Sequence, residues 1–391
     1  MKRAPIADIL WLFIATRLLL VAVTYIGYIL FPVPPHVYPV QPVDIVGLLT
    51  SWNHWDAARY TQIAQSGYQN IYDTAFFPLF PLLIKGGALL IGNQGYIAVG
   101  MIISNLALLG ALFVLYQIAT DMLGERAGRR TILYLCIFPT AFFFFAAYNE
   151  SLFLLLTAGA FLAMRRQRWW LAGVLGLFAA LTRTAGLLLV LPYLYELWVA
   201  RKGVADDEQS ALSKAWQTLP RLLPVALIPL GTLLYALYCW KVFHDPLAFS
   251  TVQSHWDRQL TLPGVGIVHA LGELFFIQPF GSFYEVHILF DLAATVGFIL
   301  LAVLGWRKLR SSYTLWIGLL LFFMLISPAI LNGQADALVS TQRFVLEMFP
   351  GFITLAVLGI KHPRLHQALM ITFPFLQAAM ALLFVLNRWM V

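Results

Sequence analysis

The sequence predicts an all-α integral membrane protein, a single polytopic helix bundle that extends over residues 1–391. Three observations support this fold class. Hydrophobic residues make up 61% of the chain and charged residues only 11%, whereas soluble domains carry about 25% charged residues. Several apolar runs reach the length of about 20 residues that a helix needs to cross a bilayer. The 12 Trp and 16 Tyr residues suit aromatic belts at the membrane surfaces.

The apolar runs predict eleven transmembrane helices. Their ranges are 8–31, 96–120, 131–147, 149–164, 169–183, 185–200, 219–242, 286–306, 313–331, 344–360 and 365–387. The first run follows Lys2-Arg3 and is longer than the core of about 7–15 apolar residues that a signal peptide carries. We therefore expect an uncleaved first span.

The Lys and Arg residues indicate the orientation of these spans. With the N-terminus in the cytoplasm, the basic clusters fall on the inner side, at 126–130, 165–168, 201–202 and 307–310. This is the asymmetry that the positive-inside rule describes, and it accounts for the net charge of +7 without a nucleic-acid partner. Two long outer loops follow from it, a first outer loop over 32–95 and a second outer loop over 243–285.

The segment 77–92 is apolar but unsuited to crossing a membrane. It carries Pro78, Pro81 and Lys85, and it is shorter than a full span. Counting it as a crossing would place every later basic cluster outside. We therefore expect an interfacial or re-entrant helix here, with Pro78 in its first turn.

A polar, aromatic-rich segment precedes this helix in the first outer loop. The apolar positions within 54–66 approximate the three-and-four spacing of a short amphipathic helix. Asn53 is a suitable N-cap residue, and Gly67 suits the position just after the last helical turn. The sequence therefore predicts an interfacial helix over these residues.

Asp56 in this helix allows two interpretations. Asn53 and Asp56 have the spacing of a capping box, and Arg59 is placed for an i,i+3 ion pair, which would make the acid structural. Alternatively, an acid framed by indoles beside a bilayer, on the same helical face as Arg59 and Tyr60, indicates a binding or catalytic site. The local pattern leaves both interpretations open.

Further polar residues are expected at the same outer membrane level. They are Tyr148, Glu150, Arg183, Gln334, Asp336, Gln342, Arg343 and Glu347. Ionisable groups near lipid are costly unless they pair, snorkel or face a cavity. Arg183 alone is explained by snorkelling, and Arg343 with Glu347 by an i,i+4 pair. Together these groups suit a lipid-phosphate substrate whose phosphate is bound by arginines.

The sequence indicates no disulfide, metal or cofactor. Cys136 and Cys239 fall inside apolar spans, near opposite membrane faces, and a disulfide needs Cα atoms within about 7 Å. The histidines are too scattered along the chain to predict a metal site.

The motifs of the first outer loop recur in a known order. They are Trp55-Asp56-Ala57-x-x-Tyr60-x-x-Ile63-Ala64-x-x-Gly67-Tyr68, Phe76-Phe77-Pro78-Leu79-x-Pro81, Phe138-Pro139-Thr140, Tyr148-x-Glu150-Ser151-Leu152-Phe153, Leu181-Thr182-Arg183-x-x-Gly186 and Arg343-Phe344. This order resembles the PIG-V family, whose members are like the second mannosyltransferase of GPI-anchor synthesis and include shorter prokaryotic relatives. The resemblance covers roughly residues 10–350.

The resemblance implies a GT-C-type bundle whose first outer loop bears the catalytic acid, here Asp56. It implies an inverting transfer of a hexose, typically mannose, from a polyprenyl- or dolichyl-phosphate donor to a lipid- or glycan-linked acceptor. Glu150 and Arg183 match family motif positions. The setting it implies is the outer face of a prokaryotic cell membrane, or the endoplasmic reticulum membrane in a eukaryote.

The expected roles follow from this chemistry. Asp56 would accept the proton of the acceptor hydroxyl, and Arg183, Arg343 and Arg59 would bind the donor phosphate. Substrate contacts are expected from a further group of residues, His54, Trp55, Tyr60, Tyr148 and Glu150. Core packing is an equal alternative for the aromatic ones.

Two other functional classes remain as alternatives. A transporter or lipid flippase would place ionisable groups near the bilayer midplane. A non-catalytic assembly subunit would use Asp56 only as a helix cap.

Overall fold

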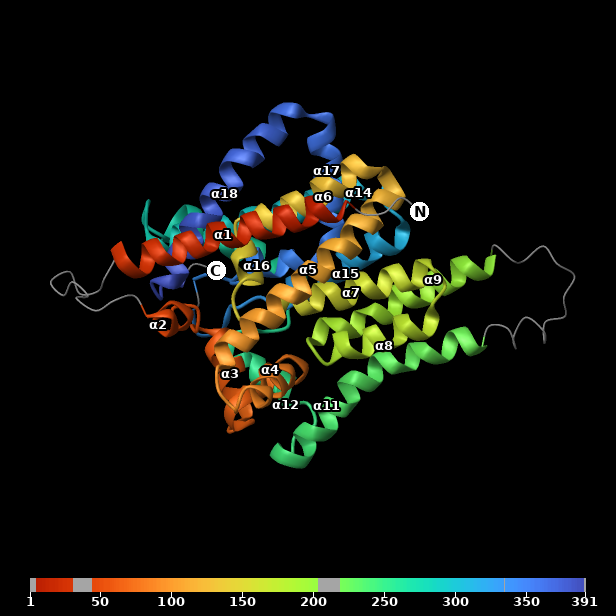
Figure 1. The fold of residues 1–391 in the computed structure, drawn as a ribbon, viewed down its shortest axis with the longest axis horizontal. Helices are drawn as coiled ribbons and strands as arrows, with labels where there is room; N and C mark the ends of the chain where they lie inside the picture. The colour runs from red at the N-terminus through yellow and green to blue at the C-terminus, as the bar shows by residue number, and fades with distance from the viewer. Residues whose placement is uncertain (1–4, 31–43, 203–218, 334, 390–391) are drawn as a thin grey trace, which may run out of the picture.

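The computed structural model describes residues 5–30, 44–202, 219–333 and 335–389, and most of them are helical (Figure 1). The α-helices are α1 Ile6–Leu30, α2 Ile45–Thr50, α3 Asp56–Ser66, α4 Leu79–Leu90, α5 Tyr96–Leu123, α6 Glu125–Ile137, α7 Glu150–Arg165, α8 Trp169–Ala180, α9 Val190–Lys202, α11 Leu227–Phe243, α12 Ala248–Thr251, α13 Val265–Gly272, α14 Phe283–Gly305, α15 Ser311–Leu325, α16 Thr341–Phe344, α17 Phe349–Lys361 and α18 Pro363–Val385. Among these described residues, the β pairing is one isolated bridge between Arg258 and Ala329.

Short helical turns of other types connect these helices. They are η1 Ile71–Ala75, η2 Ala141–Phe144, η3 Thr184–Leu189, η4 Leu223–Ala226, η5 Val252–Trp256, η6 Glu273–Ile277, η7 Leu331–Gly333 and η8 Val345–Glu347.

Within the residues that the structure describes, five helices are long and apolar enough to cross a membrane: Ile6–Ile29, Tyr96–Leu123, Leu219–Phe243, Phe283–Gly305 and Pro363–Val385. A bent pair, Thr341–Glu347 with Phe349–Lys361, would be a sixth. Each remaining predicted span overlaps a shorter helix. The all-α membrane bundle is thus confirmed, whereas the number of eleven crossings stays a prediction.

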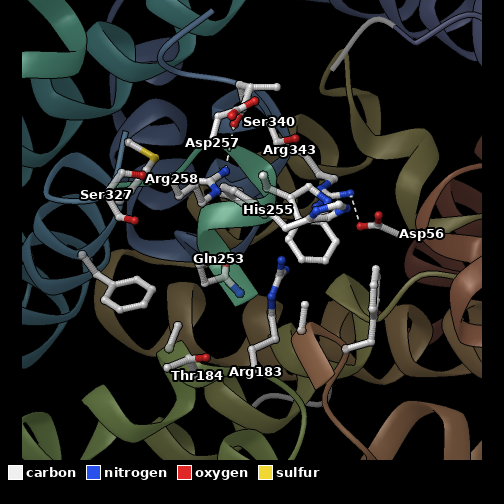
Figure 2. Close-up of a pocket in the computed structure, with 18 of the residues that line it drawn as sticks. Asp56, Arg183, Thr184, Gln253, His255, Asp257, Arg258, Ser327, Ser340 and Arg343 are labelled. Atoms are coloured by element: carbon white, nitrogen blue, oxygen red, sulfur yellow. Dashed lines mark hydrogen bonds and ion pairs between the residues drawn. The ribbon is translucent and has the colours of Figure 1, made fainter. Parts of the chain in front are cut away.

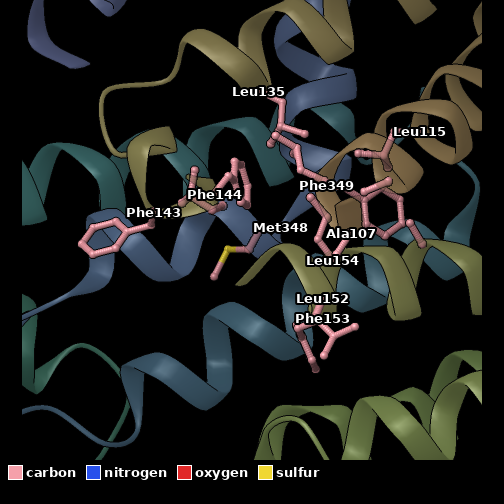
Figure 3. Close-up of a cluster of buried hydrophobic side chains, with 14 of the residues drawn as sticks. Ala107, Leu115, Leu135, Phe143, Phe144, Leu152, Phe153, Leu154, Met348 and Phe349 are labelled. Carbon is pink, nitrogen blue, oxygen red and sulfur yellow. The ribbon is translucent and has the colours of Figure 1, made fainter. Parts of the chain in front are cut away.

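The bundle is built by neighbouring helices around one large apolar core. Helix α5 packs against α6 and α7, α7 against α8, α8 against α11, and α6 against α17, while α1 lies beside α18 (Figure 1). Phe143, Phe144, Phe153 and Phe349 are fully buried in the core between these helices (Figure 3). Burial of one such side chain contributes about 1.5–3 kcal/mol.

Three predicted spans are interrupted, and the interruptions come together around the site described below. Helix α6 ends at Ile137 because the following Pro139 cannot continue a helix. The run 185–200 begins as the tight turn η3, and the run 344–360 is bent by 86° next to Met348. In a membrane protein, irregular backbone is tolerated where it is buried in protein or lines a cavity.

The interfacial helices of the first outer loop are present with one correction. Helix α3 begins at Asp56, and its N-cap residue is Trp55 with φ 55°, so the predicted capping box at Asn53 is wrong. The Asn53 side chain instead accepts a hydrogen bond from the Thr61 hydroxyl at 3.0 Å. Gly67 ends the helix at φ 76°, as predicted.

The segment 77–92 forms α4, a helix of 12 residues. At about 1.5 Å per residue it is too short to cross a bilayer, which agrees with the predicted non-crossing helix. Cys136 and Cys239 are buried free thiols in separate apolar clusters.

The turn that presents Arg183 depends on a close backbone approach at Gly186. A Cβ atom at Gly186 would overlap the backbone of Ala179 at the end of α8. We expect Gly186→Ala to lower the free energy of unfolding by about 1–3 kcal/mol, as overpacking does. Thermal unfolding in detergent measures this loss.

The matched control is Gly86→Ala in α4, where an added Cβ would meet open space. Because alanine favours a helix over glycine, this variant should be as stable as the parent or slightly more so. Equal unfolding temperatures for the two variants would contradict the proposed backbone clash.

Candidate active site

A cavity of about 1100 Å³ lies beside the start of α3. Its walls come from α3, the turn between α8 and η3, the segment around η5, and the segment that leads into α16 (Figure 2). Asp56, Arg183, Arg258 and Arg343 line it. The cavity therefore brings the Asp56 carboxylate and these three guanidinium groups together from four separate parts of the chain.

Five of the charged residues form a continuous series of ion pairs, which we call the charge chain. Arg343 donates to the Asp56 carboxylate at 2.7 Å, and its Nε lies 3.3 Å from Glu150. Arg183 lies 3.4 Å from the same Glu150 oxygen and also contacts Glu347. The order along the charge chain is thus acid, arginine, acid, arginine, acid.

Local structure places both acids that contact Arg343 at helix N-termini. Asp56 is the first residue of α3, and Glu150 is the first residue of α7. The free backbone N–H groups of a first helical turn favour negative charge. Glu150 is 1% exposed and the Arg343 side chain 7%, whereas the Asp56 side chain is 26% exposed. Asp56 is therefore the accessible end of the charge chain.

The two ion pairs expected from sequence spacing are replaced by longer-range ones. Asp56 pairs with Arg343 rather than Arg59, and Arg343 turns to Asp56 and Glu150 rather than Glu347. A buried guanidinium group is costly unless it is paired or hydrogen-bonded, and the fold supplies acids for Arg343 from α3 and α7.

Arg59 occupies the rim of the site. Its guanidinium group lies 4.0 Å from the buried Asp73, and half of its side chain is exposed. It lines the cavity but stays outside the charge chain. Its predicted role in phosphate binding is thus less direct than that of Arg183 or Arg343.

Two predicted aromatic contacts lie in the cavity wall. The Trp55 ring packs 5.0 Å from Trp389. The Tyr60 ring is buried between Phe76 and Phe80, at 5.2 and 5.0 Å. Burial raises the pKa of Tyr60 well above its usual value, so its hydroxyl stays protonated. Both residues serve packing as well as lining the site.

The other three predicted contact residues lie behind the wall. Glu150 holds Arg183 and Arg343 from behind, and the buried Tyr148 ring lies 5.5 Å from the Arg343 guanidinium. The His54 ring packs 6.0 Å from Phe384. Burial lowers the pKa of His54, which favours a neutral ring at pH 7. None of these three residues is among those that line the cavity, and their substrate contacts stay a prediction.

Arg258 is a site residue that the sequence interpretation missed. It donates to the carbonyl oxygens of Ser327 at 3.0 Å and Val339 at 3.2 Å. Burial, followed by the charge of Arg343, lowers the pKa of Arg258 to about 10, so it remains charged at neutral pH. Its sequence signal was the His-Trp-Asp of the first outer loop repeated at 255–257.

The three guanidinium groups surround a single aromatic ring, that of Phe344. Arg183 and Arg343 lie 5.0 Å from the ring centroid, and Arg258 lies 5.5 Å from it. Figure 2 shows all three arginines directed into the same cavity. Guanidinium groups gathered in this way can bind a phosphate through charge-assisted hydrogen bonds.

One of the histidines lies next to two acids, and the three could bind a metal ion together. His287, Asp291 and Asp336 are buried together, and their potential ligand atoms lie within 4.8 Å of one another. Two of the three, His287 and Asp336, also line the cavity.

Glu150 should be the residue on which the stability of the charge chain depends most. Replacing it with alanine leaves two inward-facing guanidinium groups without their shared acid, and removal of one partner of a buried pair costs about 3–5 kcal/mol. We expect Glu150→Ala to lower the unfolding temperature in detergent strongly.

Glu150→Gln is the matched control because its side-chain oxygen can still accept the hydrogen bond from Arg183 and face the Arg343 guanidinium group. Its loss of stability should be clearly smaller. If both variants unfold at the parental temperature, the charge chain contributes little to the fold.

The comparisons with known proteins agree with this geometry. The family described as Mannosyltransferase (PIG-V) matches residues 43–246. GPI alpha-1,6-mannosyltransferase 2 of Mus musculus is 37% identical over 165 residues, which cover 39% of this chain and 34% of the mouse protein. The protein of the same name from Homo sapiens is 35% identical over 168 residues, 40% of this chain and 34% of the human protein. The match thus spans about a third of the length of these curated relatives.

A solved structure shares the fold. The crystal structure of ArnT from Cupriavidus metallidurans bound to undecaprenyl phosphate superposes with a TM-score of 0.52 and 15% identity, over 94% of this chain and 64% of that chain. At this identity the likeness concerns the fold alone, and it confirms the predicted GT-C-type membrane bundle. The family match covers more than half of the sequence and includes Asp56, Glu150 and Arg183, so this chain belongs to the PIG-V mannosyltransferase family.

Proposed function

We propose that this protein is a membrane glycosyltransferase that transfers a hexose, most simply mannose, from a polyprenyl-phosphate donor to a hydroxyl of a lipid- or glycan-linked acceptor. One observation carries the proposal. The accessible carboxylate of Asp56 lies 2.7 Å from Arg343, in a cavity that Arg183 and Arg258 also line. A proton acceptor and a phosphate-binding surface are thus adjacent, as a sugar-phosphate donor requires.

The three arginines around Phe344 are the proposed binding site of the donor phosphate. Guanidinium groups bind phosphate in a planar, bidentate geometry and remain charged when partly buried. As the bond between sugar and phosphate breaks, charge grows on the phosphate oxygens, and preorganised cations stabilise it. The undecaprenyl phosphate bound to the ArnT of similar fold supports a polyprenyl-linked donor.

The proposed reaction is a single displacement with inversion. The acceptor oxygen attacks the anomeric carbon while its proton passes to Asp56. The bond from that carbon to the phosphate oxygen breaks on the opposite face, and the phosphate leaves with the electron pair. General-base assistance of this kind is worth about 10²–10⁴-fold in rate.

The charge chain suggests how donor binding would prepare the base. In the structure Arg343 is shared between Asp56 and Glu150. A donor phosphate would compete with Asp56 for the same guanidinium group. Binding of the donor would therefore loosen the Asp56–Arg343 pair and free the carboxylate for proton transfer.

The charge distribution supports an outer-face reaction. With the N-terminus in the cytoplasm, Asp56 and Arg258 lie in the two predicted outer loops. We place the site at the extracytoplasmic surface of a prokaryotic cell membrane, or the lumenal surface of the endoplasmic reticulum in a eukaryote.

Asp56→Asn should reduce transfer by at least about 10²-fold, because the amide cannot take up the proton. The measurement is the label that membranes transfer from radiolabelled polyprenyl-phosphate-mannose to lipid or protein. Asp245→Asn is the control, since Asp245 accepts hydrogen bonds only from its own loop, from Leu247 and Thr251. Undiminished transfer by Asp56→Asn would remove Asp56 from the base role.

Arg183→Ala should weaken donor binding by about 10-fold or more, the effect of losing a hydrogen bond to a charged group. Arg59→Ala is the matched control, because its half-exposed guanidinium group is directed to Asp73 at the rim and exposed pairs contribute little. Donor affinity is measured with the same labelled lipid in detergent. Equal effects of the two substitutions would contradict a specific role for Arg183.

A further inference from the structure

The group of His287, Asp291 and Asp336 has the geometry of a metal site. His287 and Asp291 lie one helical turn apart on α14, so their side chains share a face. Asp336 approaches them from the segment that precedes α16. Their exposed fractions are 4%, 0% and 2%, and their potential ligand atoms lie within 4.8 Å of one another.

The two carboxylates are oriented by the backbone, and each leaves one oxygen unused. Asp291 accepts a hydrogen bond from the backbone N–H of Gln342 at 2.8 Å, and Asp336 accepts one from the backbone N–H of Leu338 at 3.0 Å. In the described part of the chain, Oδ2 of each residue is buried without a hydrogen-bond partner. Backbone donors that fix ligand carboxylates in this way are typical of the surroundings of metal sites.

The imidazole of His287 is also oriented as a ligand. Its Nε2 lies 3.0 Å from the Trp389 carbonyl oxygen. A carbonyl oxygen can only accept, so Nε2 carries a proton, and Nδ1 is the ring nitrogen that faces Asp336. Metal-bound histidines usually have this arrangement, with the second ring nitrogen bound to a carbonyl or carboxylate.

The distance between His287 and Asp336 fits two ligands of one ion. Nδ1 lies 3.8 Å from Asp336 Oδ2, which is too long for a hydrogen bond. Two ligands that are each about 2.1 Å from one metal ion are separated by roughly 3–4 Å. The gap between these atoms is thus wide enough for a cation.

The charge balance also requires a positive partner. Two buried carboxylates side by side are costly unless a cation or a proton lies between them. The nearby Arg258 donates its hydrogen bonds to the carbonyl oxygens of Ser327 and Val339 instead.

We propose that His287, Asp291 and Asp336 bind a divalent metal ion at the wall of the cavity. One imidazole nitrogen and two carboxylates suit Mn²⁺ or Zn²⁺, whereas Ca²⁺ prefers six to eight oxygen ligands. Since His287 and Asp336 line the cavity, water or a substrate oxygen can complete the coordination. The ion-binding claim concerns the protein alone and does not depend on the proposed transfer reaction.

The ion would also position Arg343. Asp291 is bonded to the Gln342 amide, directly before Arg343 in the chain. A cation that joins α14 to Asp336 would therefore fix the segment that carries this arginine.

The test uses the full chain, purified in detergent, freed of metal with a chelator and titrated with Mn²⁺. Electron paramagnetic resonance measures free Mn²⁺ and detects the coupling of bound Mn²⁺ to a histidine nitrogen. We expect one ion per chain with a nitrogen coupling, and at least about tenfold weaker binding in Asp291→Asn and in Asp336→Asn. His287→Gln should abolish the nitrogen coupling.

Asp245→Asn is the control and should bind Mn²⁺ like the parent. A proton shared by the two carboxyl groups predicts the opposite pattern: the parent binds no ion, and Asp291→Asn is as stable as the parent. Absence of Mn²⁺ and Zn²⁺ binding by the parent, or equal affinity of the parent and both Asn variants, would overturn the proposal. If the variants do not fold, the nitrogen coupling of the parent decides the question alone.

Discussion

The structure of the site depends on the buried guanidinium group of Arg343, which Asp56 and Glu150 share. This contact joins residues 287 positions apart in the chain and fixes α3, α7 and α16 relative to one another. A buried charge without a partner costs several kcal/mol. A conformation that separated these elements would leave the Arg343 guanidinium group unpaired inside an apolar bundle. The same requirement orders the next links, from Glu150 to Arg183 and from Arg183 to Glu347. The charge chain thereby gives an otherwise apolar fold one specific arrangement at the cavity.

Breaks in the membrane-embedded helices supply the space and the polar groups of the cavity. Continuous spans satisfy their own backbone and present apolar surfaces, as α5 and α14 do over most of their length. The interrupted runs behave differently: Arg183 precedes the turn η3, and Arg343 lies beside the 86° bend that leads into α17. Each break frees backbone groups that need polar surroundings. The Arg258 side chain donates hydrogen bonds to two backbone carbonyl oxygens near the cavity, those of Ser327 and Val339. The same helix breaks therefore form the cavity and place polar side chains where they can bond to the free backbone groups.

The cavity has two electrostatic halves with different requirements. On one side, three guanidinium groups surround Phe344; carboxylates hold Arg183 and Arg343, and backbone carbonyl oxygens hold Arg258. On the other side, one oxygen of each of the Asp291 and Asp336 carboxylates is buried without a hydrogen-bond partner in the described part of the chain. The segment from 336 to 343 connects the two halves through the bond from Asp291 to the Gln342 amide. An anion on the first side and a cation on the second would thus act on the same short segment, and each would influence the placement of Arg343.

The sequence by itself determined the membrane fold class, the approximate helix positions, the family, and Asp56, Arg183 and Arg343 as cavity residues. Apolar length and motif order are local properties, so they can be read along the chain. The tertiary structure decided which charges pair. Asn53 does not form the predicted capping box. Asp56 pairs with Arg343 instead of the predicted Arg59, and Arg343 pairs with Glu150 instead of the predicted Glu347. It also revealed Arg258 and the group around His287. The attraction within a buried ion pair is much stronger than that within an exposed pair at i,i+3 or i,i+4. Burial is a property of the folded bundle rather than of any one segment.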